Sequence, residues 1–286
     1  NTSEFEKEKA NYELQKNKLS LQVAKTYEQI VYWQHQERLY SYLDSLYQNF
    51  SKASDRRFEL GETNYLEKIT AQSKYRQIKT KLTQINFEKK AQYESLQALV
   101  QSDEKISILE KELVPIPTLD TTSNKAIHTA YLESISKMYK SQISLQKQHW
   151  LPDLNLEYFQ GRNNGLSQSL YGFQVGIAVP ILFSGNVSKT KVAQLESQSW
   201  EEQKQNQEQK MTQFIRQQQN EIAKYQESIN YYNATGKKLS EEIIKVANSS
   251  YKNGEIDFFQ YIQSLENAGA IKIEYVEAVL QFNSNQ

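Results

Sequence analysis

Residues that end helices are scarce in this chain. Its 286 residues include only 9 Gly and 4 Pro, and acidic and basic residues alternate along long stretches, as they do on solvated helix faces. Only 38% of the residues are hydrophobic and the mean hydropathy is -0.75, which argues against a compact core. The composition therefore predicts a mainly α fold made of long helices.

The pattern along the chain divides it into four parts. Apolar residues recur at helical spacing in two long pairs of helices, and Pro115 and Pro117 mark an irregular connector after the first pair. The predicted parts are 1–101, a first helical hairpin; 102–123, the connector; 124–185, a helix followed by a β-hairpin; and 186–286, a second helical hairpin.

Apolar and polar residues alternate on both sides of the Gly- and Asn-rich stretch 161–169. This period of two predicts two strands joined by a turn. Such strands are typical of a transmembrane β-barrel, but a soluble hairpin packed on the helices has the same pattern. One hairpin cannot close a barrel, so membrane strands would require several subunits. The predicted membrane-facing residues are Leu154, Leu156, Tyr158, Phe173, Val175, Ile177 and Val179.

Two breaks between helices share one motif. Around Gly61 and Gly254 the chain has an aromatic residue, two residues, Gly-Glu, one residue, then Asn or Asp and two large apolar residues. Glycine at a helix end allows the left-handed conformation that stops the helix, and Asn64 or Asp257 can cap the next one. The match indicates an internal duplication. Extended backward, it places the start of the chain against the residues after the β-hairpin, so the first repeat is expected to lack a hairpin of its own.

Apolar residues of the second helical hairpin keep spacings of three and four. This heptad pattern predicts a helix packed against another helix with coiled-coil geometry. The predicted seam residues are Ile222, Tyr225, Ile229, Tyr232, Gly236, Leu239, Ile243 and Val246.

The sequence contains no motif of a catalytic site. Its 34 basic and 34 acidic residues cancel, so no net charge points to nucleic acid. Because there is no Cys, disulfides and thiolate metal ligands are excluded, and phosphate-binding, nucleophile and metal-ligand motifs are missing. His35, His128 and His149 are far apart in sequence and are expected on helix surfaces. We therefore expect no enzyme, no cofactor and no bound metal.

Segments beside the turns and strands are similar to those of a known family. The helices before the two turns end in Phe58–Gly61 and Tyr251–Gly254, Trp150–Leu154 leads into the first strand, and Gly176–Gly185 leads out of the second. In this order the segments resemble the TolC-like outer membrane efflux proteins, over essentially the whole chain. The residues around the hairpin are most similar to the heavy-metal branch, including versions fused to the inner-membrane pump.

The resemblance implies a fold and an assembly. Family members form trimers, with a twelve-stranded barrel in the outer membrane of Gram-negative bacteria and a coiled-coil α-barrel across the periplasm. The chain would then be a passive export conduit for metal ions or small toxic compounds. Its expected partners are a periplasmic adaptor (membrane fusion protein), an inner-membrane RND pump, further copies of itself and outer-membrane lipid, but no nucleic acid.

The resemblance also places the two glycine turns at the periplasmic tip, where the channel opens and the adaptor docks. The expected adaptor contacts are Leu60, Gly61, Glu62, Thr63, Asn253, Gly254, Glu255 and Ile256. Family members often carry acidic gating residues two turns beyond the second glycine, where this chain has glutamines. The expected gate residues are Asp257, Gln260 and Gln263, with Asp257 and Glu255 nearest to an acidic ring; helix capping and solvated charge are the alternative.

Two other classes of protein fit parts of the pattern. A helical pore-forming toxin also combines long helices with a membrane-inserting β-hairpin, and a soluble coiled-coil scaffold would have long helices without a pore. The duplicated glycine turn favours the conduit, because a toxin needs no such repeat.

Overall fold

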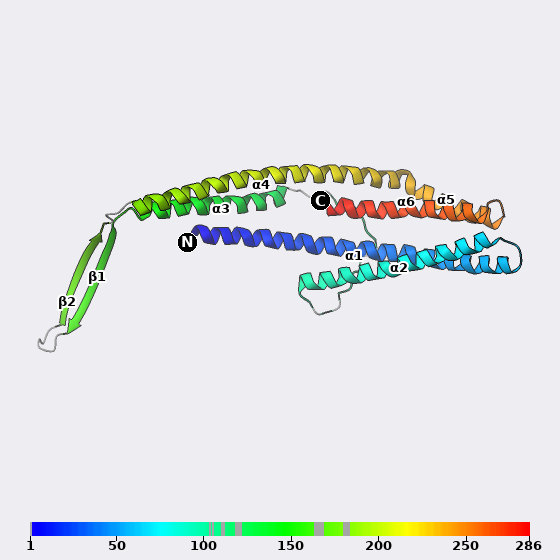
Figure 1. The fold of residues 1–286 in the computed structure, drawn as a ribbon, viewed down its shortest axis with the longest axis horizontal. Helices are drawn as coiled ribbons and strands as arrows, with labels where there is room; N and C mark the ends of the chain where they lie inside the picture. The colour runs from blue at the N-terminus through cyan, green and yellow to red at the C-terminus, as the bar shows by residue number, and fades with distance from the viewer. Residues whose placement is uncertain are drawn as a thin grey trace. The chain divides into compact units, whose positions relative to one another are not determined.

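The structure, a computed structural model, describes residues 2–102, 104, 106–109, 112–117, 122–162, 169–179 and 184–286. Its fold is mainly α with one antiparallel β-hairpin, as predicted (Figure 1). Helix α1 has 58 residues and is about 87 Å long at ~1.5 Å per residue. The elements are α1 (Thr2–Glu59), α2 (Tyr65–Val100), α3 (Thr122–Gln148), β1 (Asp153–Arg162), β2 (Ser169–Ala178), α4 (Ser184–Tyr231), the π-turn η1 (Tyr232–Gly236), α5 (Lys237–Lys252) and α6 (Phe258–Ser284).

The chain forms two compact units. Unit 1 comprises residues 1–15 and 122–212, and unit 2 comprises residues 16–121 and 213–286. Helices α1 and α4 run through both units. The four-part division made from the sequence follows chain order and stays a prediction. Within the described residues, no helix carries an apolar stretch long enough to cross a membrane.

Unit 1 is built on α3 and the first part of α4. Trp200 of α4 donates from Nε1 to Oγ of Ser136 on α3 at 3.0 Å. Its ring also stacks on Tyr139, with the ring centroids 6.1 Å apart. Just before β1, Trp150 donates from Nε1 to Oγ1 of Thr190 on α4 at 3.2 Å. This bond ties the entry of the hairpin to α4.

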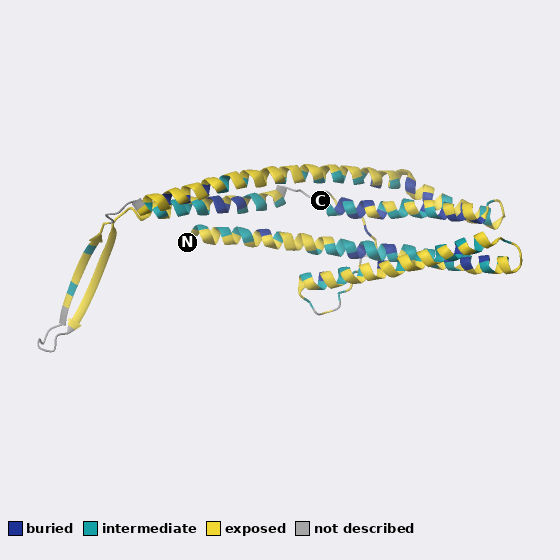
Figure 2. Ribbon diagram, viewed as in Figure 1, coloured by how far each residue is buried: buried dark blue, intermediate teal, exposed yellow. Residues whose placement is uncertain are grey.

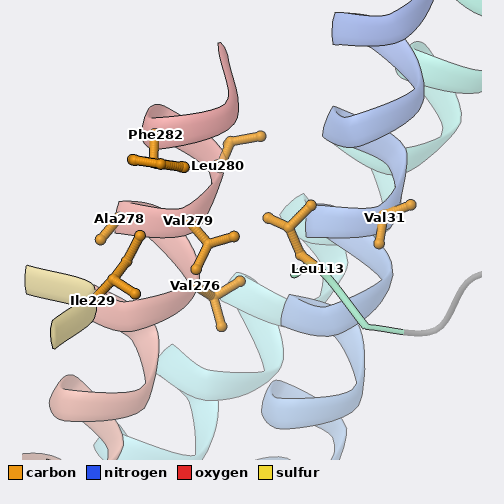
Figure 3. Close-up of a cluster of buried hydrophobic side chains, with 8 residues drawn as sticks. All are labelled: Val31, Leu113, Ile229, Val276, Ala278, Val279, Leu280 and Phe282. Atoms are coloured by element: carbon orange, nitrogen blue, oxygen red, sulfur yellow. The ribbon is translucent and has the colours of Figure 1, made fainter. Parts of the chain in front are cut away.

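Unit 2 contains two clusters of buried apolar side chains, which appear in Figure 2 as short dark stripes among half-buried and exposed residues. Figure 3 shows the first, the shaft cluster, which joins α1, the connector, α4 and α6. The tip cluster joins α1, α2, α5 and α6 close to the helical turns. The buried members of the shaft cluster are Val31, Leu113, Ile229, Val276, Ala278, Val279, Leu280 and Phe282. Those of the tip cluster are Tyr47, Ala71, Ala247, Phe258, Tyr261, Ile262 and Leu265.

The π-turn Tyr232–Gly236 separates α4 from α5, and the heptad pattern did not predict it. In this turn a backbone N–H donates to the carbonyl five residues back, so the turn takes up one extra residue and rotates the helix that follows. Ser240 and Ala247 are therefore buried. Leu239 and Val246, which were expected in the seam, are 40% and 54% exposed. The predicted seam is wrong beyond the π-turn.

Two amide side chains at the end of the chain hold the connector: the buried Asn283 of α6, and Gln286, which donates from Nε2 to the carbonyl of Ile116 at 3.3 Å. Oδ1 of Asn283 accepts from the N–H of Ile116 at 3.0 Å, and its Nδ2 donates to the carbonyl of Val114 at 3.0 Å. Asn283 also hydrogen-bonds Glu28 on α1. Leu113, next to these residues, lies in the shaft cluster. One amide side chain thus holds the connector backbone and a half-buried carboxyl together.

Glu28 should make the stability of the protein depend on pH. Burial raises its pKa from 4.5 to about 6, although the bond from Asn283 and the charge of Lys25 favour the ionised form. Between these two pKa values the folded protein binds more protons than the unfolded chain, so its free energy of unfolding should fall as pH rises through this window. Glu28→Gln should remove most of this fall.

Thermal unfolding midpoints measured from pH 4 to pH 7.5 would test this expectation. The exposed Glu88 of α2 provides the matched control, since Glu88→Gln removes a carboxyl outside the connector site. A Glu28→Gln profile that runs parallel to that of the wild type would contradict the expectation.

Candidate functional site

Both glycine turns have the same backbone conformation. Gly61 has φ 70° and Gly254 has φ 72°, in the left-handed region that glycine adopts without strain. Each glycine N–H donates to the carbonyl three residues back, at 3.0 and 3.1 Å, and the next N–H donates to the carbonyl five residues back, at 2.8 Å in both turns. This pair of bonds is the Schellman motif. The motif repeated in the sequence is therefore repeated in the structure.

The residues after each turn start the next helix in the predicted way. The side chain of Asn64 accepts from the N–H of Glu67 at 2.9 Å and caps α2. The side chain of Asp257 accepts from the N–H of Gln260 at 2.8 Å and caps α6. Both turns lie at the same end of unit 2 (Figure 1), next to the tip cluster. We call this end of unit 2 the tip.

The predicted adaptor contacts lie on these turns, but their side chains differ in exposure. Thr63 is half-buried and donates from Oγ1 to Oε2 of Glu67 at 2.5 Å. Ile256 packs against the tip cluster, so its side chain is directed into the protein. The remaining six are exposed: Leu60, Gly61, Glu62, Asn253, Gly254 and Glu255.

The predicted gate residues lie at the start of α6, where Asp257 is the N-cap and Gln260 and Gln263 are in the first two turns. Asp257 and Gln260 form a capping box, because Oε1 of Gln260 accepts from the N–H of Asp257 at 3.1 Å in return for the bond described above. Gln263 is exposed and donates from Nε2 to Oδ1 of Asn267 at 2.9 Å. Helix capping therefore accounts for two of the three side chains, and the gate stays a prediction.

Phe50 of α1 joins the two helical hairpins at the tip, a role that the apolar pattern of the sequence did not predict. Its ring centroid lies 5.0 Å from that of Tyr261, 5.4 Å from that of Phe258 and 5.5 Å from that of Tyr251. The aromatic residues of the turn motif were the signal that could have suggested such a contact. A second link is the ion pair between Nζ of Lys74 on α2 and Oε1 of Glu266 on α6, at 2.6 Å.

Equivalent residues of the two repeats differ in burial. Phe258 and Ile262 at the start of α6 are 3% and 5% exposed, because α1 packs on them. Their counterparts at the start of α2, Tyr65 and Ile69, are 61% and 44% exposed. Leu66 between them is also exposed. Phe259, the counterpart of Leu66, is 43% exposed. The first repeat therefore presents an apolar stripe of Tyr65, Leu66 and Ile69 at the tip, and the second repeat buries only the counterparts of Tyr65 and Ile69.

The β-hairpin sorts its side chains onto two faces. The register pairs Leu154 with Ile177, Leu156 with Val175 and Tyr158 with Phe173. These residues and Val179 share the apolar alternation predicted from the sequence, and all are 58–77% exposed. The other face carries Asn155, Glu157 and Gln174, with the ring of Phe159 lying over Gly172, where a Cβ would come within 2.5 Å of Cζ.

The site as described offers surfaces for contact with other molecules. Within the described ranges, no group of three His, Asp or Glu side chains could hold a metal ion. Unit 2 presents two exposed turns and an apolar stripe on α2 at its tip. Unit 1 presents the apolar face of its antiparallel hairpin.

Sequence comparison gives one match to a protein family. Residues 136–281 match the family described as "Outer membrane efflux protein". A comparison with curated proteins finds no match.

Solved structures with the same fold cover nearly the whole chain. The Campylobacter jejuni CmeC outer membrane channel has a TM-score of 0.82 at 15% identity, over 99% of this chain and 64% of its own. The outer membrane protein VceC from Vibrio cholerae has a TM-score of 0.84 at 14% identity, and the match covers 99% of this chain and 72% of VceC. CusC, a transmembrane channel, has a TM-score of 0.78 at 15% identity, and the match covers 99% of this chain and 71% of CusC.

These likenesses establish the fold and do not single out a branch. The chain spans about two thirds of the length of the solved channels. CusC is no more similar to it than CmeC or VceC, so the expected resemblance to the heavy-metal branch stays a prediction.

Proposed function

Because the chain belongs to the outer membrane efflux protein family, we propose that it is the channel component of a tripartite efflux system. In this role it is a passive conduit for metal ions or small toxic compounds. A periplasmic adaptor and an inner-membrane RND pump are its proposed partners. The single observation that carries this proposal is the family match across the β-hairpin and most of the second helical repeat.

Family membership confirms two expectations from the sequence. The protein is not an enzyme, and it belongs to the outer membrane and periplasm of a Gram-negative bacterium. The same match favours the conduit over a pore-forming toxin or a soluble scaffold, since neither of those classes is an efflux protein.

The proposed adaptor site is the tip. Two turns of identical backbone geometry stand side by side there, and each presents a glycine followed by an exposed glutamate. Their Schellman bonds and helix caps fix the backbone before any partner binds, which lowers the entropy lost on docking. The exposed side chain of Leu60 and the polar side chains of Asn253 and Glu255 supply the proposed contacts.

A photo-crosslinking amino acid placed at Leu60 or Asn253 in living cells tests this site. We expect one crosslinked product at each position that contains a periplasmic adaptor. The exposed Glu88, on α2 away from the tip, serves as the control position. Crosslinks to the adaptor from Glu88 but from neither turn would refute the proposed site.

Neighbouring copies of the chain are proposed to pack in the same way as the two repeats pack within one chain. Within the chain, Leu46 and Phe50 of α1 pack against the start of α6. Leu239 and Ile243 of α5 lie as far before Gly254 as Leu46 and Phe50 lie before Gly61. The segment of the first repeat that corresponds to the start of α6 is the exposed apolar stripe of α2. We expect α5 of one copy to cover α2 of the next. A heterologous contact of this kind builds a ring when its rotation closes, and the family resemblance suggests a ring of three copies.

The β-hairpin is proposed to contribute strands to a barrel in the outer membrane. Its face of seven apolar residues is exposed, as a lipid-facing surface requires. The polar opposite face would line the lumen. Further strands from other copies would pair the two edges, which cannot stay unpaired in lipid.

Asp257 allows a test that separates a gate from a helix cap. Asn caps helices about as well as Asp, whereas Ala costs about 1 kcal/mol. If Asp257 only caps α6, Asp257→Asn should export like the wild type and Asp257→Ala should be less stable. If its charge gates the entrance, both variants should change the conductance or ion selectivity of the reconstituted channel to a similar extent.

A further inference from the structure

Residues 112–117 of the connector lie on the end of α6, and we call them the strap. Pro115 and Pro117 each have a fixed φ. Each proline also pushes the residue before it, Val114 or Ile116, toward an extended backbone. A segment that is already extended loses little further conformational entropy when it docks.

Only side chains hold the strap backbone. Within the described residues, no backbone group of the strap bonds to another backbone group. The N–H of Ile116 and the carbonyls of Val114 and Ile116 are bonded instead by Asn283 and Gln286. The structure describes all of the strap, and Leu113 is its only buried residue. A segment held by so few contacts is typical of those that open locally while the rest of the protein stays folded.

Asn283 also connects the strap to a titratable group. Its Oδ1 accepts from the strap, and its Nδ2 donates to the carbonyl of Val114. The same amide bonds the half-buried carboxyl of Glu28 on α1. An ionised carboxyl can only accept, so Nδ2 serves both Val114 and Glu28. One amide group therefore couples the position of the strap to the charge of Glu28.

We propose that the strap docks reversibly on the end of α6, and that ionised Glu28 opposes docking. The docked strap keeps water away from Asn283 and Glu28, and opening admits water to both. A carboxylate is more stable in water than half-buried, so its charge favours the open state. The inference concerns unit 2 alone and holds whatever the protein exports.

The two states of Glu28 set the expected pH dependence. Burial raises its pKa from 4.5 to about 6 in the docked state, against the bond from Asn283 and the charge of Lys25. In the open state the pKa should return toward 4.5. The docked state binds the proton more tightly, so docking should be tightest below pH 4.5 and weaken as pH rises through about 6. The strap from Leu113 to Pro117 carries no charge of its own.

A second pair of groups acts in the same direction. Glu112 of the strap favours the protonated form of His35 on α1, so a protonated His35 would attract the docked strap. Nδ1 of His35 is buried without a hydrogen-bond partner among the described residues, and the expectation that His35 lies on a helix surface is wrong. Burial, and then the charge of Arg38, lowers the pKa of His35. The ring is therefore neutral over most of this range, and its contribution should be the smaller one.

Labelling of introduced cysteines on the intact protein measures docking. The chain has no cysteine, so only the introduced thiol reacts. Leu113→Cys is at a position that is buried while the strap is docked. Its neighbour Val114 is 58% exposed, so Val114→Cys reports the intrinsic reactivity at each pH. Val279→Cys, from the core of the shaft cluster, reports wider opening of the unit.

At pH 8 we expect Leu113→Cys to react at least about tenfold more slowly than Val114→Cys and at least about tenfold faster than Val279→Cys. A rate equal to that of Val279→Cys would overturn the proposal, because the strap would then open only with the rest of the unit. A rate equal to that of Val114→Cys would also overturn it, because the strap would not be docked.

The ratio of the Leu113→Cys rate to the Val114→Cys rate should rise about tenfold from pH 5 to pH 8. Glu28→Gln still accepts a bond from Asn283 but cannot ionise, so it should remove most of this rise. His35→Gln should remove only a small part. Glu88→Gln, at an exposed position of α2, is the matched control and should keep the whole rise. The absence of a rise, or a rise that Glu28→Gln leaves intact, would refute the role of Glu28.

Asn283→Ala tests the side chain that holds the strap. It should raise the same ratio at least about tenfold at both pH values, because it removes the bonds to Ile116 and Val114 together. If this variant does not fold, as judged from its helicity, the comparison of Glu28→Gln with Glu88→Gln still decides. An unchanged ratio in folded Asn283→Ala would show that the strap is held by other contacts and would contradict the proposal.

Discussion

Phe50→Ala should lower the free energy of unfolding by about 2 kcal/mol, which is less than the roughly 3–5 kcal/mol typical of a fully buried Phe, because the ring is only half-buried. The ring joins α1 to Tyr251, Phe258 and Tyr261, and these contacts hold the two hairpins together at the tip. Each aromatic pair contributes beyond its buried area. Truncation leaves a cavity between hairpins that the relaxed side chains fill only in part. Urea unfolding followed by helical circular dichroism measures the loss.

Phe87→Ala is the matched control for this prediction. Phe87 is on α2 and is 70% exposed, so the same chemical change there should cost less than about 1 kcal/mol. Equal losses for Phe50→Ala and Phe87→Ala would show that the aromatic contacts at the tip do not hold the hairpins together.

Ile69→Glu and Leu239→Glu should each weaken self-association at least about 100-fold. Both residues are exposed in the single chain and are proposed to be buried between copies. A carboxylate buried there without a partner costs several kcal/mol, and each 1.4 kcal/mol weakens binding tenfold. Sedimentation velocity of the intact protein in detergent measures the change. The helicity of the single chain should not change, since neither side chain is in a buried cluster.

Lys52→Glu supplies the control for the added charge. Lys52 is exposed on α1 and lies outside the proposed contact, so its reversal should leave the sedimentation profile unchanged. A loss of assembly in Lys52→Glu but in neither interface variant would contradict the proposed packing of α5 on α2.

The turns and helix ends could be predicted because local chemistry determines them. Gly61 and Gly254 stop their helices through a backbone conformation that other residues rarely adopt, and Asn64 and Asp257 start the next helices with their own side chains. The β-hairpin was predictable for the same reason, since alternation of period two is visible in a short window.

The interior register of the second hairpin could not be predicted in the same way. The predicted seam residues keep helical spacing through the π-turn. That spacing does not show that the turn contains one extra residue. Whether Leu239 or Ser240 faces inward depends on the space left by α6, where the carbonyl of Ala268 lies close enough to accept a bond from Ser240. Contacts between segments far apart in sequence determine which residue faces inward. They also determine the hydrogen bonds between Asn283 and the connector.

The proposed site was only partly visible in the sequence. Position relative to the glycines identified the exposed residues of both turns, but it also included Ile256, which packs inward. It missed the apolar stripe of α2, because Tyr65 and Ile69 match residues that the second repeat buries. The difference lies in what packs on each repeat, and a comparison of the two motifs alone contains no information on that.

Export by living cells tests the central claim most directly. The measurement is the retention of a panel of metal ions and small toxic compounds in cells that lack the protein, that carry the wild type, or that carry Ile69→Glu. We predict that at least one class of compound accumulates without the protein, that the wild type restores export of that class, and that Ile69→Glu does not. Equal retention of every compound in all three strains would contradict the assignment of this protein as an efflux channel.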